Sequence, residues 1–264
     1  MAAKHNISRA GQLFYGNGDN AVNHGLNHRP GVPIAPLTKV SLGSPVPLST
    51  AALVSAATST ELPNASTKTY TTATDNTTPL DGAATAPSTV FLNGANVLVW
   101  VLDVPRNITS VNTKTGTTAA LTITVTGYDV YGVPMTETIT SPATSTSIVA
   151  DGKKAFKWVY SIAIYSAADA TSNTLSIGWG DVLGLPYALT AKSDLLTNSV
   201  YFNDVLEATA PTVVKADATT PATATTGDVR GTVLLASATN TVTIALMARF
   251  DPTSNLTQFG VTQV

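Results

Sequence analysis

Apolar and polar residues alternate with a period of two along much of the chain after residue 90. In residues 121–126, Leu121, Ile123 and Val125 alternate with threonines, which predicts a strand with one core face and one hydroxyl face. Residues 156–164 alternate in the same way, and the predicted core face consists of Phe156, Trp158, Tyr160, Ile162 and Ile164. Residues 242–250 form a third such run, with a core face of Val242, Ile244, Leu246 and Phe250.

The pattern is weaker before residue 90. Residues 48–60, LSTAALVSAATST, are compatible with one short helix, and the Thr-, Asn- and Ala-rich residues 63–89 predict long loops or weak edge strands. No stretch after residue 90 has the 3.6-residue period of an amphipathic helix. The sequence therefore predicts an all-β protein, an antiparallel β-sandwich of jelly-roll-like type with a body over residues 48–264.

Residues 97–102, VLVWVL, are apolar on both faces and lead into Asp103 and a Pro-Arg-Asn turn. We expect Pro105 to end the strand's hydrogen-bonding ladder and Arg106 to pair with Asp103 or another nearby carboxylate. Two interpretations of the strand remain open: burial of both faces within one chain, or one face packed against a sister subunit. In the second interpretation the interface residues are Val97, Val99, Trp100 and Arg106.

Composition points to a surface of hydroxyls rather than charges. The chain of 264 residues contains 44 threonines, while charged residues make up only 11%, against about 25% in ordinary soluble proteins. Threonine is β-branched and suits the wet face of a strand. Cysteine is absent, which removes disulfides and thiolate metal sites.

Residues 1–47 predict an extended N-terminal arm. Five glycines interrupt residues 11–31 and five prolines interrupt residues 30–47, so no regular element is expected there. The arm is either a solvated tail or a segment that becomes ordered on a neighbouring subunit. Leu13, Phe14 and Tyr15 favour the second interpretation as an apolar anchor, and Arg9 and Arg29 are its candidate charged contacts.

Charge is distributed unevenly along the chain. Residues 1–40 carry four basic side chains and one acidic (+3), and the remaining residues carry ten basic and fifteen acidic (−5). This arm is too weakly basic, and the body too acidic, for nucleic-acid binding. No apolar run approaches the roughly 18 residues of a membrane span, and no signal peptide is visible, so we expect a soluble product of the cytoplasm without a membrane partner.

The sequence offers little for catalysis. All three histidines lie in residues 5–28, and no nucleophile elbow or phosphate-binding loop occurs. Asp103, Asp129, Glu137 and Asp181 are the carboxylates available for a glycosidase, but the sequence brings no pair of them together, and turn-forming aspartate is the commoner role. We therefore predict no enzyme, no metal and no cofactor. Trp179, between two glycines, is the tryptophan that we expect to be exposed, as a possible ligand platform.

Four segments together resemble virion structural proteins of tailed bacteriophages: LDVPRNIT (102–109), LTITVTGYDVYGVPMTETIT (121–140), GKKAFKWVYSI (152–162) and TLSIGWGDVLGLPYAL (174–189). They occur in the same order as in those proteins, and the resemblance covers residues 97–190, about a third of the chain. It implies a non-enzymatic capsid decoration or cement protein on the outer surface of the head, made in the host cytoplasm. The implied partners are the major capsid protein and the chain itself, with a homotrimer as the first expectation.

Two other functions remain open at this point, and a third, the major shell protein, is disfavoured. A tail, neck or fibre component would use the same sandwich for ring assembly or host-glycan binding, with exposed aromatics around Trp179 and Tyr187. A carbohydrate-active enzyme would need two facing carboxylates in a cleft. The major shell protein itself would need a long spine helix, for which the sequence gives no pattern.

Overall fold

The computed structural model describes residues 37–57, 62–71, 87–114, 116–145, 147–189, 195–216, 227–236 and 242–249. Within these ranges the chain forms fifteen strands and no helix, and every strand pairing is antiparallel. The prediction of an all-β, antiparallel sandwich-like fold is thereby confirmed.

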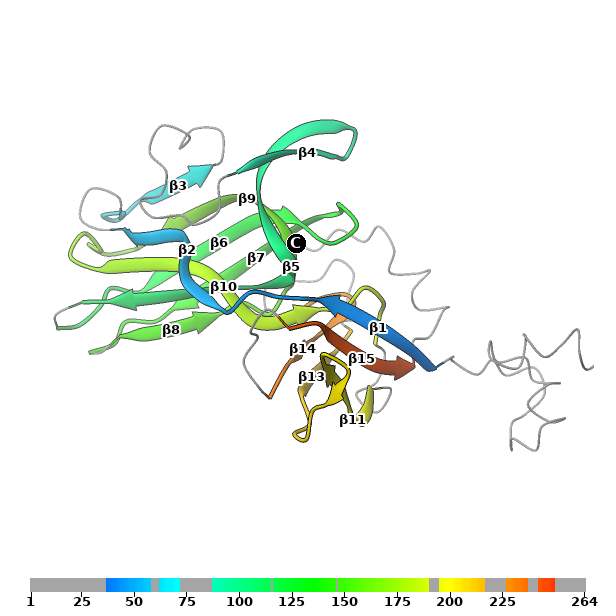
Figure 1. The fold of residues 1–264 in the computed structure, drawn as a ribbon. Coiled ribbons are helices and arrows are strands. Elements are labelled where there is room, and N and C mark those ends of the chain that lie inside the picture. Colours follow the sequence, from blue (N-terminus) through cyan, green and yellow to red (C-terminus); the bar gives the residue numbers. More distant parts are fainter. Residues whose placement is uncertain are drawn as a thin grey trace, which may run out of the picture.

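The sandwich consists of one large sheet that curls over on itself (Figure 1). Its first layer has the order β3 (Thr67–Thr71), β9 (Phe156–Tyr165), β6 (Leu121–Tyr128), β7 (Pro134–Ser141). Its second layer has the order β2 (Ser49–Ala57), β10 (Thr174–Gly184), β5 (Ala95–Thr113), β8 (Ile148–Asp151).

The long strand β5 joins the two layers. Trp100, Val101 and Arg106 pair with β9 of the first layer. Arg106 and residues 108–113 pair with β10 of the second layer, and residues 109–112 pair with β8. The predicted end of the ladder at Pro105 is wrong, because the strand continues through this residue. Proline has no N–H to donate, and the pairing with β9 is irregular between Val101 and Arg106, so the strand bends here instead of ending.

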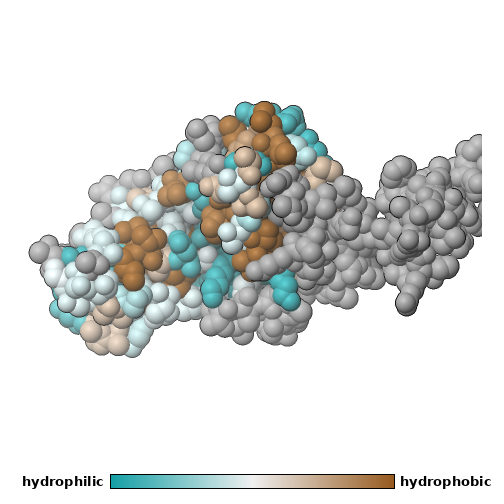
Figure 2. Space-filling view, turned by 90° about the horizontal axis from the view of Figure 1, so that it is seen from below, coloured by the Kyte–Doolittle hydropathy of each residue, from teal (hydrophilic) through white to brown (hydrophobic). Residues whose placement is uncertain are grey.

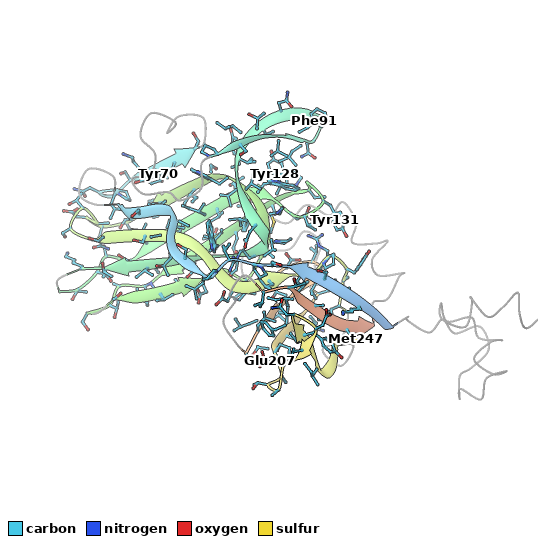
Figure 3. All side chains as sticks on the ribbon, in the orientation of Figure 1. Tyr70, Phe91, Tyr128, Tyr131, Glu207 and Met247 are labelled. Carbon is cyan, nitrogen blue, oxygen red and sulfur yellow. The ribbon has the colours of Figure 1, made fainter. Side chains whose placement is uncertain are left out.

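A hairpin extends from the start of β5. Strand β4 (Ser88–Leu92) pairs with residues 95–99 across a turn in which Asn93 (φ 49°) and Gly94 (φ 79°) are both left-handed, as a two-residue hairpin turn requires. The hairpin projects from the sandwich (Figure 1). Phe91 lies at its outer end with 70% of its surface exposed (Figure 3).

A second, smaller unit completes the fold. Its four-stranded sheet has the order β1 (Leu37–Gly43), β15 (Ile244–Arg249), β11 (Leu195–Phe202), β12 (Val205–Leu206). Strands β14 (Gly231–Leu234) and β13 (Thr212–Lys215) continue the large sheet from the end of β10. We call these six strands the small module, because they share a second core that includes Leu42, Val233 and Leu246 and is completed by Leu183 from the end of β10.

Two N-terminal predictions are corrected by these strands. Residues 49–57 form β2 rather than a helix, because pairing with β10 outweighs the weak helical preference of an Ala-rich segment. Residues 37–43 of the predicted arm form β1, which pairs with β15 along its length. The boundary drawn at residue 47 therefore falls inside the folded body, and residues 1–36 lie outside the described residues.

The alternation predicted for β6 is confirmed, since Leu121, Ile123 and Val125 are buried. The alternation predicted for β9 is confirmed only in part. Phe156, Ile162 and Ile164 are buried, whereas Trp158 is only half-buried, Val159 is buried and Tyr160 is exposed. The partners of residues 126 and 127 on β6 are Ser161 and Val159, so Tyr160 is the extra residue of a β-bulge. A bulge shifts the side-chain phase by one residue, which is why a strict period of two misplaces both side chains.

The hydroxyl-rich surface predicted from composition is visible in the structure. Thr122, Thr124 and Thr126 lie on the less buried face of β6, opposite its core residues. Seen from below, the sandwich is covered mostly by pale atoms of intermediate hydropathy, with small brown areas between them (Figure 2). The sandwich core includes Leu53, Phe156, Ile162 and Ile177.

Candidate functional site

The four segments that carry the resemblance to virion proteins meet in one group of mostly buried charged and polar side chains, in which Asp103 and Asp181 are partly accessible to solvent. We call this group the polar seam, and it consists of Asp103, Arg106, Asn107, Asp129, Glu137, Lys154, Asp181, Asp228 and Arg230. Seven of these nine residues come from the four segments, and Asp228 and Arg230 come from the turn before β14.

The polar seam lies between the two apolar cores. On one face of β5, Arg106 stands between Val104 of the small module's core and Ile108 of the sandwich core. On β10, Asp181 stands between Leu183 and Trp179 in the same way. Successive residues of one strand face are about 7 Å apart, so each strand passes from one core to the other across a single polar position.

Arg106 is the centre of one end of the seam and is completely buried. Its Nε donates to the carbonyl of Gly180 at 2.7 Å, and its Nη1 donates to the carbonyl of Val46 at 3.0 Å. Its guanidinium also lies 3.1 Å from Asp103 Oδ1 and 3.3 Å from Asp181 Oδ1. The predicted pairing of Arg106 with Asp103 is thus confirmed, and one guanidinium joins the sandwich to the segment that connects β1 to β2.

Trp179 closes the same end of the seam. Its ring centre lies 6.0 Å from Arg106 Cζ, and its Nε1 donates to the carbonyl of Pro47 at 3.2 Å. The prediction that Trp179 is exposed is wrong, because only 8% of its surface is accessible. The flanking glycine explains the error: a Cβ on Gly178 would lie 1.8 Å from the carbonyl oxygen of Ser49. This glycine permits β2 to pass close over β10, and does not mark an open loop.

Asn107 connects Arg106 to the middle of the seam. Its Nδ2 donates to the carbonyl of Gly152 at 3.1 Å, and its Oδ1 accepts from the N–H of Val182 at 3.1 Å. A Cβ on Gly180 would lie 2.4 Å from this Oδ1. Asn107 therefore holds the β8–β9 connection against β10, and a glycine at position 180 leaves room for its amide.

Glu137 occupies the middle of the seam and is almost fully buried. Its carboxylate accepts the backbone N–H groups of Lys153 and Lys154, and Lys154 Nζ donates to the carbonyl of Thr136 at 2.7 Å. Burial raises the pKa of Glu137 to about 7, against the opposing effect of those hydrogen bonds. This carboxylate fixes the turn that precedes β9.

Asp129, Asp228 and Arg230 form the far end of the seam. Arg230 Nη2 lies 2.7 Å from Asp129 Oδ2, and both side chains are buried. Asp228 accepts the N–H of Ala155 at 3.1 Å and that of Arg230 at 2.8 Å, and burial raises its pKa. Asp129 also accepts the N–H groups of residues 131 and 133, so it organises the β6–β7 turn. The turn before β14 is thereby tied to the first layer.

The four candidate interface residues are not a free surface. Val99, Trp100 and Arg106 are buried within the single chain, and Val97 is partly buried. The structure therefore favours the interpretation in which both faces of residues 97–102 are covered by the chain itself. The arm residues Arg9, Leu13, Phe14, Tyr15 and Arg29 lie outside the described residues.

Sequence reasoning identified Asp103, Arg106 and Asp181 but gave no seam role to Asp129, Glu137, Lys154, Asp228 or Arg230. One signal was present: Glu137 is the only charged residue in the strand segment 134–141, where an isolated charge needs a partner. The partners themselves come from long-range pairing. Arg230 and Asp129 are 101 residues apart in the chain.

A groove opens beside the seam, between the edge strands β7 and β8. Its volume is about 350 Å³, and its lining includes Glu137, Ile139, Pro142, Val149, Asp151 and Lys153. Among the described strands, β7 pairs only with β6 and β8 only with β5. The groove is thus bordered by two edge strands that lie near each other without pairing.

Comparison with family models, with curated proteins and with solved structures found no match to this chain. The described residues contain no group of three or more His, Cys, Asp or Glu side chains placed to hold a metal ion. In the same part of the chain there is no helix with the length and apolar character needed to cross a bilayer.

Proposed function

We propose that this chain is a non-enzymatic structural protein of a tailed-phage particle. More specifically, we propose a decoration or cement protein that binds the lattice of the major capsid protein on the outside of the head. The observation that carries the proposal is the polar seam. The segments that resemble virion proteins are dispersed over residues 102–189, yet their charged residues meet in one network between two cores. Such a network supports rigidity of the body.

The arrangement of the carboxylates supports a structural rather than a catalytic role. A glycosidase needs two carboxylates that face each other across room for a sugar. Asp103 and Asp181 instead share one buried guanidinium, that of Arg106. Glu137 accepts backbone N–H groups, and Asp228 does the same. Each of these carboxylates already has a structural partner.

The surface also supports the proposal. A decoration protein is exposed to solvent on a crowded particle and needs a surface that resists aggregation and nonspecific binding. A hydroxyl-covered sheet with few charges meets this need. We propose a homotrimer located on the virion, with its N-terminal arm (Arg9, Leu13, Phe14, Tyr15 and Arg29) as the contact to the lattice or to neighbouring subunits.

The alternative role, a tail, neck or fibre component that binds host glycans, has less support. It depends on exposed aromatic side chains around Trp179 and Tyr187. Trp179 is buried, which leaves Tyr187, 44% exposed, as the one of these two aromatics that lies at the surface.

The test is a binding assay on particles stripped of this protein. The full chain is compared with a full-length variant in which Leu13, Phe14 and Tyr15 are replaced by serine. Truncation at residue 47 is unsuitable because it removes β1 and the carbonyl partners of Arg106 and Trp179. Saturable coating of heads by the full chain, with at least tenfold weaker binding of the variant, is expected. Binding to tails or glycans but not to heads would overturn the proposal.

A further inference from the structure

The outer face of the first layer is a regular grid of uncharged side chains. Strands β3, β9, β6 and β7 pair in this order, and their registers align residues of the four strands in straight rows (Figure 1). Ile123, Ile139 and Ile164 point into the core, so the residues that alternate with them face outward. We call this surface the threonine face, and its rows are Thr140–Thr122–Tyr165–Thr67, Thr138–Thr124–Ala163–Thr69 and Thr136–Thr126–Ser161–Thr71.

Aromatic side chains stand at both ends of the threonine face. At one end Trp158 is directly opposite Tyr128 in the next row, and both side chains are partly accessible. Tyr160, the bulge residue of β9, is 38% exposed two positions from Trp158. At the other end Tyr165 is 46% exposed. Outward residues of one strand recur about every 7 Å, so three row steps separate the two aromatic ends by about 20 Å.

The chemistry of this surface fits a neutral carbohydrate chain. None of the residues in the rows is charged, so the face itself offers neither cations for an anionic ligand nor carboxylates for a cationic one. Each threonine hydroxyl donates one hydrogen bond and accepts two, as the hydroxyls of a sugar do. Aromatic rings have a negative face, which attracts the C–H groups on the apolar side of a pyranose ring.

A second copy of the chain is a poorer match for the threonine face. The buried centre of a subunit interface is apolar, whereas seven of the eight positions in the two rows that lack Tyr165 carry hydroxyl groups. Burial of hydroxyls against protein is costly unless each one is hydrogen-bonded, and a hydrated sugar chain supplies those partners directly or through water. Threonine is also restricted at χ1, so the grid loses little side-chain freedom when a ligand binds.

We propose that the threonine face binds a neutral polysaccharide chain. The chain lies along β6 and β9, with sugar rings stacked at the Trp158–Tyr128 end and on Tyr165, and with threonine hydroxyls of β6 and β7 as hydrogen-bond partners between them. This surface does not include Trp179 or Tyr187. The inference goes beyond the decoration role and does not require it. On a particle, many copies would bind one glycan layer together, so a weak single site is sufficient.

Affinity electrophoresis in native gels tests the proposal with the full chain. The probes are three neutral polysaccharides, hydroxyethyl cellulose, dextran and α-mannan, and one anionic polysaccharide, alginate. We expect at least one neutral probe to retard the protein and alginate to leave its mobility unchanged. Absence of retardation by all three neutral probes, or equal or stronger retardation by alginate, would overturn the proposal.

Matched variants locate the binding. Tyr165→Ala removes a stacking ring, and the double variant Thr124→Val, Thr138→Val removes one cross-strand pair of hydroxyls while it keeps the shape of the side chains. Each should weaken binding about fivefold, with the urea midpoint as the check on folding. Tyr187→Ala is the control, because Tyr187 is similarly exposed but lies outside the face, and it should bind like the wild type. Weaker binding of Tyr187→Ala with unchanged binding of Tyr165→Ala would contradict the assignment.

Sedimentation velocity distinguishes a second copy from a glycan as the occupant. A wild-type dimer that Thr124→Arg dissociates would show that another subunit covers the face, and would refute the inference. We expect Thr124→Arg to leave the oligomeric state unchanged and to weaken polysaccharide binding. Polysaccharide binding without shell binding refutes only the decoration role, and shell binding without polysaccharide binding refutes this inference alone.

Discussion

Replacement of Arg106 by methionine tests whether the polar seam holds the two cores together. Methionine keeps the length of the side chain but removes the guanidinium that serves Asp103, Asp181 and two backbone carbonyls. Removal of one partner from a buried ion pair costs about 3–5 kcal/mol. Here it takes the buried donor away from Asp181 and from the carbonyls of Gly180 and Val46, while Asp103, with 23% of its side chain accessible, can turn to solvent. For a chain of this size each kcal/mol lowers the melting temperature by about 2–4 °C. We therefore expect a melting temperature about 6–20 °C lower and a clearly lower urea midpoint.

Two comparison variants make this result specific. Lys39→Met breaks the exposed Lys39–Asp204 pair, whose Nζ–Oδ1 distance is 2.8 Å, and should leave the urea midpoint unchanged. Asp103→Asn and Asp181→Asn, added to Arg106→Met, should recover part of the lost stability because no unpaired charge remains. A loss below about 1 kcal/mol for Arg106→Met alone would refute the role assigned to the seam.

Three further predictions concern other parts of the fold. The pKa of Glu137 in the folded protein is about 7, against an ordinary value of 4.5, so the charged form of this side chain destabilises the native state. The free energy of unfolding should therefore fall by about 3 kcal/mol as the pH rises from 4.5 to 7. Glu137→Gln should abolish this part of the pH dependence, measured as the urea midpoint. Gly178→Ala places a Cβ 1.8 Å from the Ser49 carbonyl oxygen and should displace β2, seen as faster amide hydrogen exchange in residues 49–57, whereas unchanged exchange would contradict the close approach. Deletion of residues 1–36 should preserve the near-ultraviolet circular dichroism of the folded body, whereas deletion of residues 1–47 should not, because β1 is then lost.

Local pattern was enough to predict the class of the fold and several strand faces. The alternation of threonine with aliphatic residues in β6 is a strong signal, because in a half-buried strand the alternation alone shows which face lies in the core and which faces solvent. The pattern failed at Tyr160, where the bulge depends on how β6 aligns with β9. It failed again in residues 49–57, where an Ala-rich segment becomes a strand only because β10 is beside it.

The candidate site was less accessible to prediction, because its members are close only in three dimensions. Asp103 and Arg106 were paired correctly since they are three residues apart. Asp181 and Arg230 reach the same network through the pairing of β10 with β5 and with β14, which no local pattern specifies. The glycine beside Trp179 was interpreted as a sign of exposure, although it allows a neighbouring backbone to approach.

The pairing of β1 with β15 has a consequence for the order of events during synthesis. The first and last described strands are neighbours although more than 200 residues separate them. All strands of the sandwich are complete when residue 184 has left the ribosome, whereas the sheet of the small module waits for β15. Until then β1 is an unpaired strand that can pair with the wrong partner. Slow translation of the last third of the chain should therefore favour misassembly of the small module and spare the sandwich.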